Sequence, residues 1–335
     1  MNQVGAQTEI IFDGGSLVFD GEGALKAEMS YFEEELRLFD LQTITEALPI
    51  KGQQDSDIAQ IHDALILGIR DYFSKSDFRK AVLGLSGGID SAVVCALACK
   101  ALGPENVTAV LMPSKYSSPH SIKDAMDLVN AIGCKHEIIG IAPAAKAFDE
   151  MMAASFAGLP FNLTEENIQA RCRGIVLMAM SNKFGYILLN TSNKSECAVG
   201  YGTLYGDMCG AIGVIGDVYK TQVFQLARYL NKDKAIIPEN TIIKPPSAEL
   251  RPDQKDSDSL PDYEVLDKIL FQHIELKKGW HAIVAAGFDE SLVRRVLKMV
   301  NQAEFKRYQT PPILRVSPKA FGMGRRMPIV GKYRI

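Results

Sequence analysis

The sequence predicts an α/β protein in which a doubly wound parallel sheet carries helices on both faces. Its central part alternates short apolar segments with longer amphipathic ones. This alternation is typical of parallel strands joined by crossover helices, whose ligands bind beyond the carboxyl ends of the strands. The expected strands cover 81–85, 107–112, 136–141 and 186–190, and the expected helices cover 91–102, 119–132, 142–154 and 164–183.

The segments on either side of this core have different patterns. Short β-like runs at 9–12, 16–19 and 35–39 predict an N-terminal β unit over residues 1–45. A polar linker is expected over 46–57, followed by the main domain, 58–335. That domain is expected to open with an amphipathic helix through Ile58, Ile61, Leu65 and Ile69, and to include a loop rich in Pro, Ser and Asp at 245–262 and helices near 262–275 and 289–303.

The composition sets bounds on function. With 23% charged residues and a net charge of −3, the chain lacks the basic surface typical of a nucleic-acid-binding protein. No apolar run approaches the ~20 residues of a membrane helix, and acidic Glu9 and Asp13 replace the basic start of a secretory signal. The six cysteines include no Cys-x-x-Cys pair. Buried free thiols and a reducing, cytoplasmic setting are therefore expected.

The most informative motif follows the first expected strand. Ser86–Ser91 reads Ser-Gly-Gly-Ile-Asp-Ser and leads into a helix. Glycines let backbone N–H groups approach phosphate oxygens, and a helix N-terminus favours anions. Two glycines alone are typical of a turn, but the whole string between a strand and a helix predicts a phosphate site. It is not a Walker A loop, because no Gly-Lys-Ser/Thr follows. Asp90 is positioned to hold a metal ion that bridges phosphates.

A second polar motif, Thr191–Glu196, follows the fourth expected strand. Its small polar side chains and carboxylate could cap the next helix. Because it lies at the same sheet edge as the phosphate loop, a nucleotide and metal role is favoured. Asp90 and Glu196 would then supply two carboxylates for Mg²⁺, which prefers one or two of them together with phosphate oxygens.

These motifs resemble a known superfamily and one family within it. The Ser86–Ser91 string resembles the pyrophosphate loop of the N-type ATP pyrophosphatases, which split ATP between the α and β phosphates. Across residues 50–330 the chain resembles NAD synthetases, through Thr191–Glu196, Gly200–Asp207, Ile215–Thr221, Lys244–Leu250, Asp258–Pro261 and Glu304–Arg307. Asn2–Gly5 and Ile11–Ser16 resemble the last strands of a nitrilase-type glutaminase domain. That remnant implies the glutamine-dependent type, with the glutaminase active-site Cys, Glu and Lys lying upstream.

The resemblance implies two ligand sets. ATP would contact Gly84, Leu85, Ser86, Gly87, Gly88, Ile89, Asp90, Ser91, Thr191, Lys220 and Ser247. Deamido-NAD would contact Asn167, Arg171, Glu196, Tyr201, Gly202, Thr203, Leu204 and Lys306. Asp90 and Glu196 would hold Mg²⁺, and Asp90, Lys220 and Asp207 would act in catalysis.

Three details of this assignment depend on local features. Arg171 and Arg173 lie two apart on an expected helix, so only one should face the ligand, and the resemblance favours Arg171. Leu204 stands where ammonia-dependent relatives carry a lysine, so that loop would act mainly through its backbone. Asp207 would either orient ammonia or brace its loop.

The implied reaction is ATP-dependent amidation of deamido-NAD through an adenylated intermediate, with ammonia as donor and AMP and pyrophosphate as products. A homo-oligomer is expected, as in the family. Arg325-Arg326 would be a solvated basic tail, or a contact to pyrophosphate or a neighbouring subunit. Two alternatives remain: a nucleotide-binding module without turnover, and another superfamily member such as a GMP synthetase or a tRNA-modifying enzyme.

Overall fold

The central sheet has five parallel strands in the order β7–β6–β5–β8–β9. The computed structural model describes residues 1–52, 56–252 and 254–331. The strands are β5 (Ala81–Gly84), β6 (Val107–Leu111), β7 (Lys135–Ile138), β8 (Ile187–Asn190) and β9 (Ile212–Gly213). The first four confirm the predicted strands. From β5 the chain adds β6 and β7 on one side of the sheet and then β8 and β9 on the other, so the strand order reverses between β5 and β8. The carboxyl ends of these two neighbours form the crevice where such folds bind ligands.

Alternate residues of the strands pack into two separate hydrophobic cores, one on each face of the sheet, as strand geometry requires. Ala81 and Leu83 point to one face and Val82 to the other. The first face is covered by α2 (Asp57–Lys75), α3 (Ile89–Leu102), α4 (Pro119–Ile132), α8 (Lys220–Leu230) and α9 (Glu239–Ile243), and the second by α5 (Ala142–Met152) and α6 (Leu163–Phe184). The doubly wound arrangement is therefore confirmed.

Local sequence signals set the ends of the main helices. Ser56 and Ser118 cap the N-termini of α2 and α4 through their hydroxyl groups. Asn162 and Glu165 form a capping box on α6. Gly133 ends α4 in the left-handed conformation. These caps explain why the predicted helix limits agree with the structure to within two residues.

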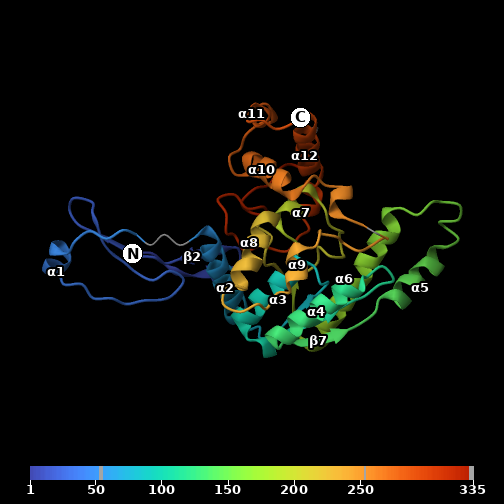
Figure 1. The fold of residues 1–335 in the computed structure, drawn as a ribbon, viewed down its shortest axis with the longest axis horizontal. Coiled ribbons are helices and arrows are strands. Elements are labelled where there is room, and N and C mark those ends of the chain that lie inside the picture. The colour runs from blue at the N-terminus through green and yellow to red at the C-terminus, as the bar shows by residue number, and fades with distance from the viewer. Residues whose placement is uncertain (53–55, 253, 332–335) are drawn as a thin grey trace.

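A third layer packs on the sheet domain from the C-terminal half of the chain and lies above it in Figure 1. Its elements are α7 (Lys194–Val199), α10 (Tyr263–Ile274), α11 (Trp280–Ala285), α12 (Glu290–Gln302) and α13 (Glu304–Arg307). Short 3-10 helices lie at Pro104–Asn106 and Asp256–Asp258. A parallel bridge between Gly213 and Ile313 brings the C-terminal segment beside β9.

Residues 1–50 extend from one side of the sheet domain, with α1 (Leu41–Glu46) at the far end (Figure 1). They form two hairpins, β1 (Val4–Gln7) with β2 (Ile10–Asp13) and β3 (Leu17–Phe19) with β4 (Leu25–Glu28). The strand predicted at 35–39 is wrong: within the described residues no strand pairs with this segment, and Leu36 and Leu38 are 93% and 91% exposed. Part of the predicted linker, residues 53–55, lies outside the described residues.

Among the helices of the described residues, none is both long enough and apolar enough to cross a bilayer.

Candidate active site

The phosphate loop has the tight backbone that its glycines predict. It leaves β5 at Gly84 and enters α3 at Ile89. Gly87 has a φ of +81°, and a Cβ there would lie 2.1 Å from the Ser121 carbonyl oxygen at the start of α4. Only glycine combines this φ with such a close approach. Within the loop the Gly88 N–H donates to Ser86 Oγ at 3.1 Å, and Ser91 Oγ donates to the Gly88 carbonyl at 3.1 Å.

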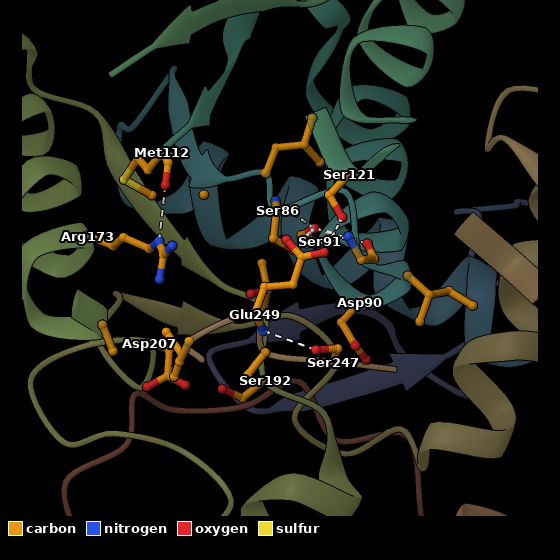
Figure 2. A pocket seen from close by; sticks show the side chains of 18 of the residues that line it. Ser86, Asp90, Ser91, Met112, Ser121, Arg173, Ser192, Asp207, Ser247 and Glu249 are labelled. Atoms are coloured by element: carbon orange, nitrogen blue, oxygen red, sulfur yellow. Dashed lines mark hydrogen bonds between the residues drawn. The ribbon is translucent and has the colours of Figure 1, made fainter. Parts of the chain in front are cut away.

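A cavity of about 290 Å³ opens beside this loop, at the carboxyl ends of β5, β6 and β8 (Figure 2). Of the predicted ATP contacts, those lining it are Gly84, Leu85, Ser86, Gly88, Ile89, Asp90, Ser91, Thr191, Lys220 and Ser247. Gly87 packs behind the loop instead, against Ser121. Residues far apart in the sequence thus converge on one pocket.

A compact charge cluster forms one wall of the cavity. The Lys220 side chain is buried and donates to Asp90 Oδ2, and its Nζ lies 3.5 Å from Glu196 Oε1. Asn193 Nδ2 donates to Asp90 Oδ1 at 2.8 Å. Because α8 begins at Lys220 and α3 begins one residue before Asp90, two helix starts meet at this ion pair.

Burial and like charges shift the pKa values within the cluster. Burial, with the Asp90 carboxylate next to it, raises the pKa of Glu196 to about 8. Burial opposes the charge of Lys220, but the carboxylates of Asp90 and Glu196 outweigh it and raise the pKa of Lys220 above its usual value. Lys220 therefore stays cationic, whereas burial and the Asp90 charge disfavour the ionised form of Glu196.

Asp256 is a third carboxylate of this wall, and it was not among the predicted site residues. It lies in the 3-10 turn within the predicted loop 245–262 and lines the same cavity. Tyr201 Oη and Tyr263 Oη donate to its two oxygens at 3.1 and 2.9 Å. Burial raises the pKa of Asp256, although Lys220 and the two tyrosines oppose the shift.

The predicted deamido-NAD contacts gather around the loop Gly200–Asp207. Thr203 Oγ1 donates to Asn167 Oδ1 at 2.7 Å, and Arg171 Nε donates to the Leu204 carbonyl at 3.2 Å. Lys306 Nζ donates to the carbonyls of Gly200 and Gly202 at 2.8 and 2.7 Å. Only two members of this set, Glu196 and Tyr201, line the main cavity. The loop therefore adjoins the nucleotide cavity as a separate group.

Asp207 joins the two groups. It lines the cavity, and its Oδ1 accepts the Thr203 N–H at 2.6 Å. Burial raises the pKa of this carboxyl. Of its two predicted roles, the hydrogen bond to Thr203 matches bracing of the loop.

Arg173, not Arg171, projects into the main cavity (Figure 2). Its Nε donates to the Met112 carbonyl at 3.2 Å. Arg171 is instead directed at the Gly200–Asp207 loop. The two-residue spacing sends the side chains to different places, as predicted, but the structure directs each one to part of the site.

The segment Lys244–Leu250 covers the outer side of the cavity. Glu249 reaches the N-terminus of α4, where it accepts from Ser118 Oγ at 3.0 Å and from Ser121 Oγ at 2.7 Å. Its φ of +49° is unusual for a residue with a side chain. Ser247 Oγ donates to the Gln254 carbonyl at 2.6 Å and accepts the Glu249 N–H at 3.1 Å (Figure 2).

A buried network anchors the loop between β8 and α7. Lys194 Nζ has no solvent exposure and pairs with Asp217 at 2.8 Å and with Glu275. It also donates to Ser317 Oγ at 2.7 Å. The next residue, Ser195, donates to Asp267 and accepts the Lys220 backbone N–H at 2.9 Å.

The family model described as NAD synthase matches residues 61–310. The chain belongs to the NAD synthase family. It is 48% identical, over 98% of its length, to the glutamine-dependent NAD(+) synthetase of Synechocystis sp.. It spans about 60% of that relative's length.

Solved structures of NAD synthetases have the same fold. The glutamine-dependent NAD⁺ synthetase of Acinetobacter baumannii in complex with ADP superposes with a TM-score of 0.70 at 41% identity, over 98% of this chain and 60% of that one. The NH₃-dependent NAD synthetase of Campylobacter jejuni, in complex with a nitrate ion, superposes with a TM-score of 0.62 at 30% identity. It matches 78% of this chain and all of its own. The NAD synthase domain is therefore the part of the chain that carries the cavity.

Proposed function

We propose that this chain converts deamido-NAD to NAD by ATP-dependent amidation, with ammonia as the nitrogen donor and AMP and pyrophosphate as products. The observation that carries the proposal is the meeting of the phosphate loop, Lys220 and the Gly200–Asp207 loop around one cavity in an NAD synthase fold. The phosphate loop and Lys220 suit a nucleoside triphosphate. The Gly200–Asp207 loop lies where a second nucleotide would extend from the reaction centre.

In the proposed reaction, the nicotinate carboxylate attacks the α-phosphorus of ATP and pyrophosphate leaves. Negative charge grows on the phosphoryl oxygens, and the buried ammonium of Lys220 is fixed beside the loop that would hold them. Ammonia then attacks the acyl carbon of the adenylate, forms the amide, loses a proton and releases AMP. The chain needs no covalent nucleophile, since positioning and charge stabilisation suffice.

The charge cluster fits the Mg²⁺ ion that the family resemblance implies. Asp90, Glu196 and Asp256 place three carboxylates around one lysine, which leaves negative charge uncompensated when all are ionised. We propose that Asp90 and Glu196 hold the ion and that Asp256 supports it. When bound, Mg²⁺ would neutralise phosphate oxygens and the leaving pyrophosphate.

The test is a product analysis with purified protein, deamido-NAD, ATP, Mg²⁺ and ammonium. Formation of NAD, AMP and pyrophosphate in equal amounts is expected, and Lys220→Met should lower kcat by at least 100-fold. Formation of ADP and phosphate would overturn the α-phosphate mechanism. Tight ATP binding without pyrophosphate release would favour the binding-module alternative. Nicotinate mononucleotide, XMP and tRNA as competing substrates test selectivity within the superfamily.

We propose further that glutamine serves as the nitrogen source only in a longer protein. The chain spans about 60% of its glutamine-dependent relatives, and residues 1–45 resemble the end of a glutaminase domain. With this chain alone, ammonium should support synthesis and glutamine should not. Synthesis driven by glutamine would refute the assignment of residues 1–45.

We also propose that the chain self-associates through the outer face of α6. Ile175 is 58% exposed, and Met178, three residues further along the same helix face, is 39% exposed, whereas other residues of α6 pack on the sheet. Neighbouring apolar side chains exposed on one helix face are typical of an interface. Light scattering should show a dimer or larger assembly that Ile175→Glu dissociates. A monomeric wild-type protein would contradict the proposal.

A further inference from the structure

Three cysteines from two separate parts of the chain meet behind the phosphate loop. Cys95 and Cys99 lie four residues apart on α3, and Cys134 follows Gly133 at the end of α4. Their Sγ atoms all lie within 4.8 Å of one another, and those of Cys95 and Cys134 are 4.0 Å apart. We propose that the three thiols form a site for one soft, thiophilic metal ion of the Zn²⁺ class.

The sulfur spacing is close to that of a three-thiolate site. A zinc–sulfur bond is about 2.3 Å, so three sulfurs in a plane around one ion would be about 4.0 Å apart. The pair Cys95–Cys134 already has this separation. The pairs with Cys99 need to close by less than about 1 Å, which side-chain torsions can supply.

The surroundings favour a soft cation over a hard one. All three cysteines are buried, and they belong to the apolar core between α3, α4 and the sheet. Thiolates select soft ions, whereas Mg²⁺ requires oxygen ligands. This site is therefore chemically distinct from the carboxylate cluster at Asp90 and Glu196.

The three thiols differ in how close they lie to the surface, and Cys99 retains 6% exposure. Cys134 also retains 7% exposure, whereas Cys95 has none. An ion would therefore reach Cys134 and Cys99 before the fully buried Cys95.

A bound ion would join α3 to the end of α4. Cys95 lies five residues after Asp90 on the same helix, a rise of about 7.5 Å. Since the three sulfurs come together only in the folded chain, ion binding stabilises the folded state.

The experiment is a titration of the full chain, reduced and freed of metal, with Cd²⁺ as the probe. The sulfur-to-cadmium charge-transfer absorption reports thiolate ligands and does not respond to carboxylates. We expect saturation at one ion per chain with the intensity of three Cd–S bonds, reversal by a chelator and a higher melting temperature. Zn²⁺ should compete for the same site.

Variants decide whether these three cysteines are the ligands. Cys134→Ala should weaken Cd²⁺ binding at least tenfold. If the metal-free alanine variant has a lowered melting temperature, Cys134→Ser is used in its place. Cys172→Ala is the matched control, because Cys172 is also buried but lies on the opposite face of the sheet. Absence of the band at one equivalent of Cd²⁺, its persistence in both Cys134 variants, or its loss in Cys172→Ala would overturn the proposal.

Discussion

Lys220 donates a hydrogen bond to Asp90 across 130 residues of sequence. The contact joins the start of α8 to the start of α3, directly beside the phosphate loop. Lys220 is buried, so its charge requires carboxylate partners, which Asp90 and Glu196 supply. The pair therefore ties the assembly of the nucleotide site to the packing of two helices.

Asp90→Asn tests the acidic half of this pair. The amide keeps the shape but removes the charge that the proposed metal and Lys220 require. We expect kcat to fall by at least 100-fold at saturating ATP and Mg²⁺. Asp127→Asn, an exposed position on α4 paired with Lys123, is the control and should keep full activity. Substantial Mg²⁺-dependent turnover by Asp90→Asn would contradict the metal role.

Gly87→Ala tests the tight approach of the phosphate loop to α4. The new Cβ would collide with the Ser121 carbonyl, so the loop must shift and ATP affinity should fall by more than tenfold. Gly133→Ala is matched in backbone, because Gly133 also has a φ of +81° but has no atom within 4 Å of an added Cβ. That control should lose only ~1–2 kcal/mol of unfolding free energy to backbone strain and bind ATP normally. Equal ATP affinities in the two variants would refute the steric argument.

The raised pKa of Glu196 predicts a pH dependence of stability. The folded state holds the Glu196 proton up to about pH 8, while the usual value is 4.5. The folded state therefore binds more protons than the unfolded state between these two pH values. The contribution of Glu196 to the free energy of unfolding is fully present below pH 4.5 and is lost as the pH rises through about 8. Relative to Glu196→Gln, the wild-type protein should lose unfolding free energy across that window. Urea unfolding at several pH values measures the difference, and a constant difference would contradict the shifted pKa.

Asp256 should matter for metal affinity although no motif pointed to it. Asp256→Asn removes one carboxylate charge from the cluster but leaves acceptor and donor atoms for the two tyrosines. The Mg²⁺ concentration for half-maximal activity should rise about tenfold. Asp258, two residues further on, is exposed and pairs with Arg251. Asp258→Asn is the control and should leave the half-maximal Mg²⁺ concentration unchanged. A similar effect of both variants would indicate a general loss of charge, not a local role.

Arg173 and Arg171 should affect different substrates. Arg173 projects into the nucleotide cavity, so Arg173→Ala should raise the KM for ATP about tenfold or more. Arg171 holds the Leu204 carbonyl, so Arg171→Ala should raise the KM for deamido-NAD with little change for ATP. Steady-state kinetics with each substrate varied in turn separates the two. The opposite pattern would exchange their assignments.

The sequence predicted the sheet well, because β5, β6 and β8 are buried apolar runs between clear helix signals. It missed β9, whose two residues are too short to show a periodicity. The strand predicted at 35–39 was wrong: leucines alternate there with charged residues, but no strand among the described residues pairs with the segment.

The site was predictable only where chemistry lies in one continuous motif. Ser86–Ser91 and Lys220 fall in such motifs and line the cavity. Asp256 and Cys134 reach their clusters by tertiary packing of segments that are distant in the sequence, and a lone aspartate or cysteine in a loop carries no local signal. The different directions of Arg171 and Arg173 depend likewise on where the Gly200–Asp207 loop folds back.

The three consecutive residues after Ser192 make contacts in three directions. Asn193 binds Asp90 of the sheet domain, Lys194 binds the C-terminal segment at Ser317, and Ser195 binds Asp267 on α10 of the third layer. Opening this turn would break contacts to the sheet domain, the third layer and the C-terminal segment at once. Its amide protons should consequently exchange with solvent only through global unfolding, so that this turn does not open on its own at equilibrium.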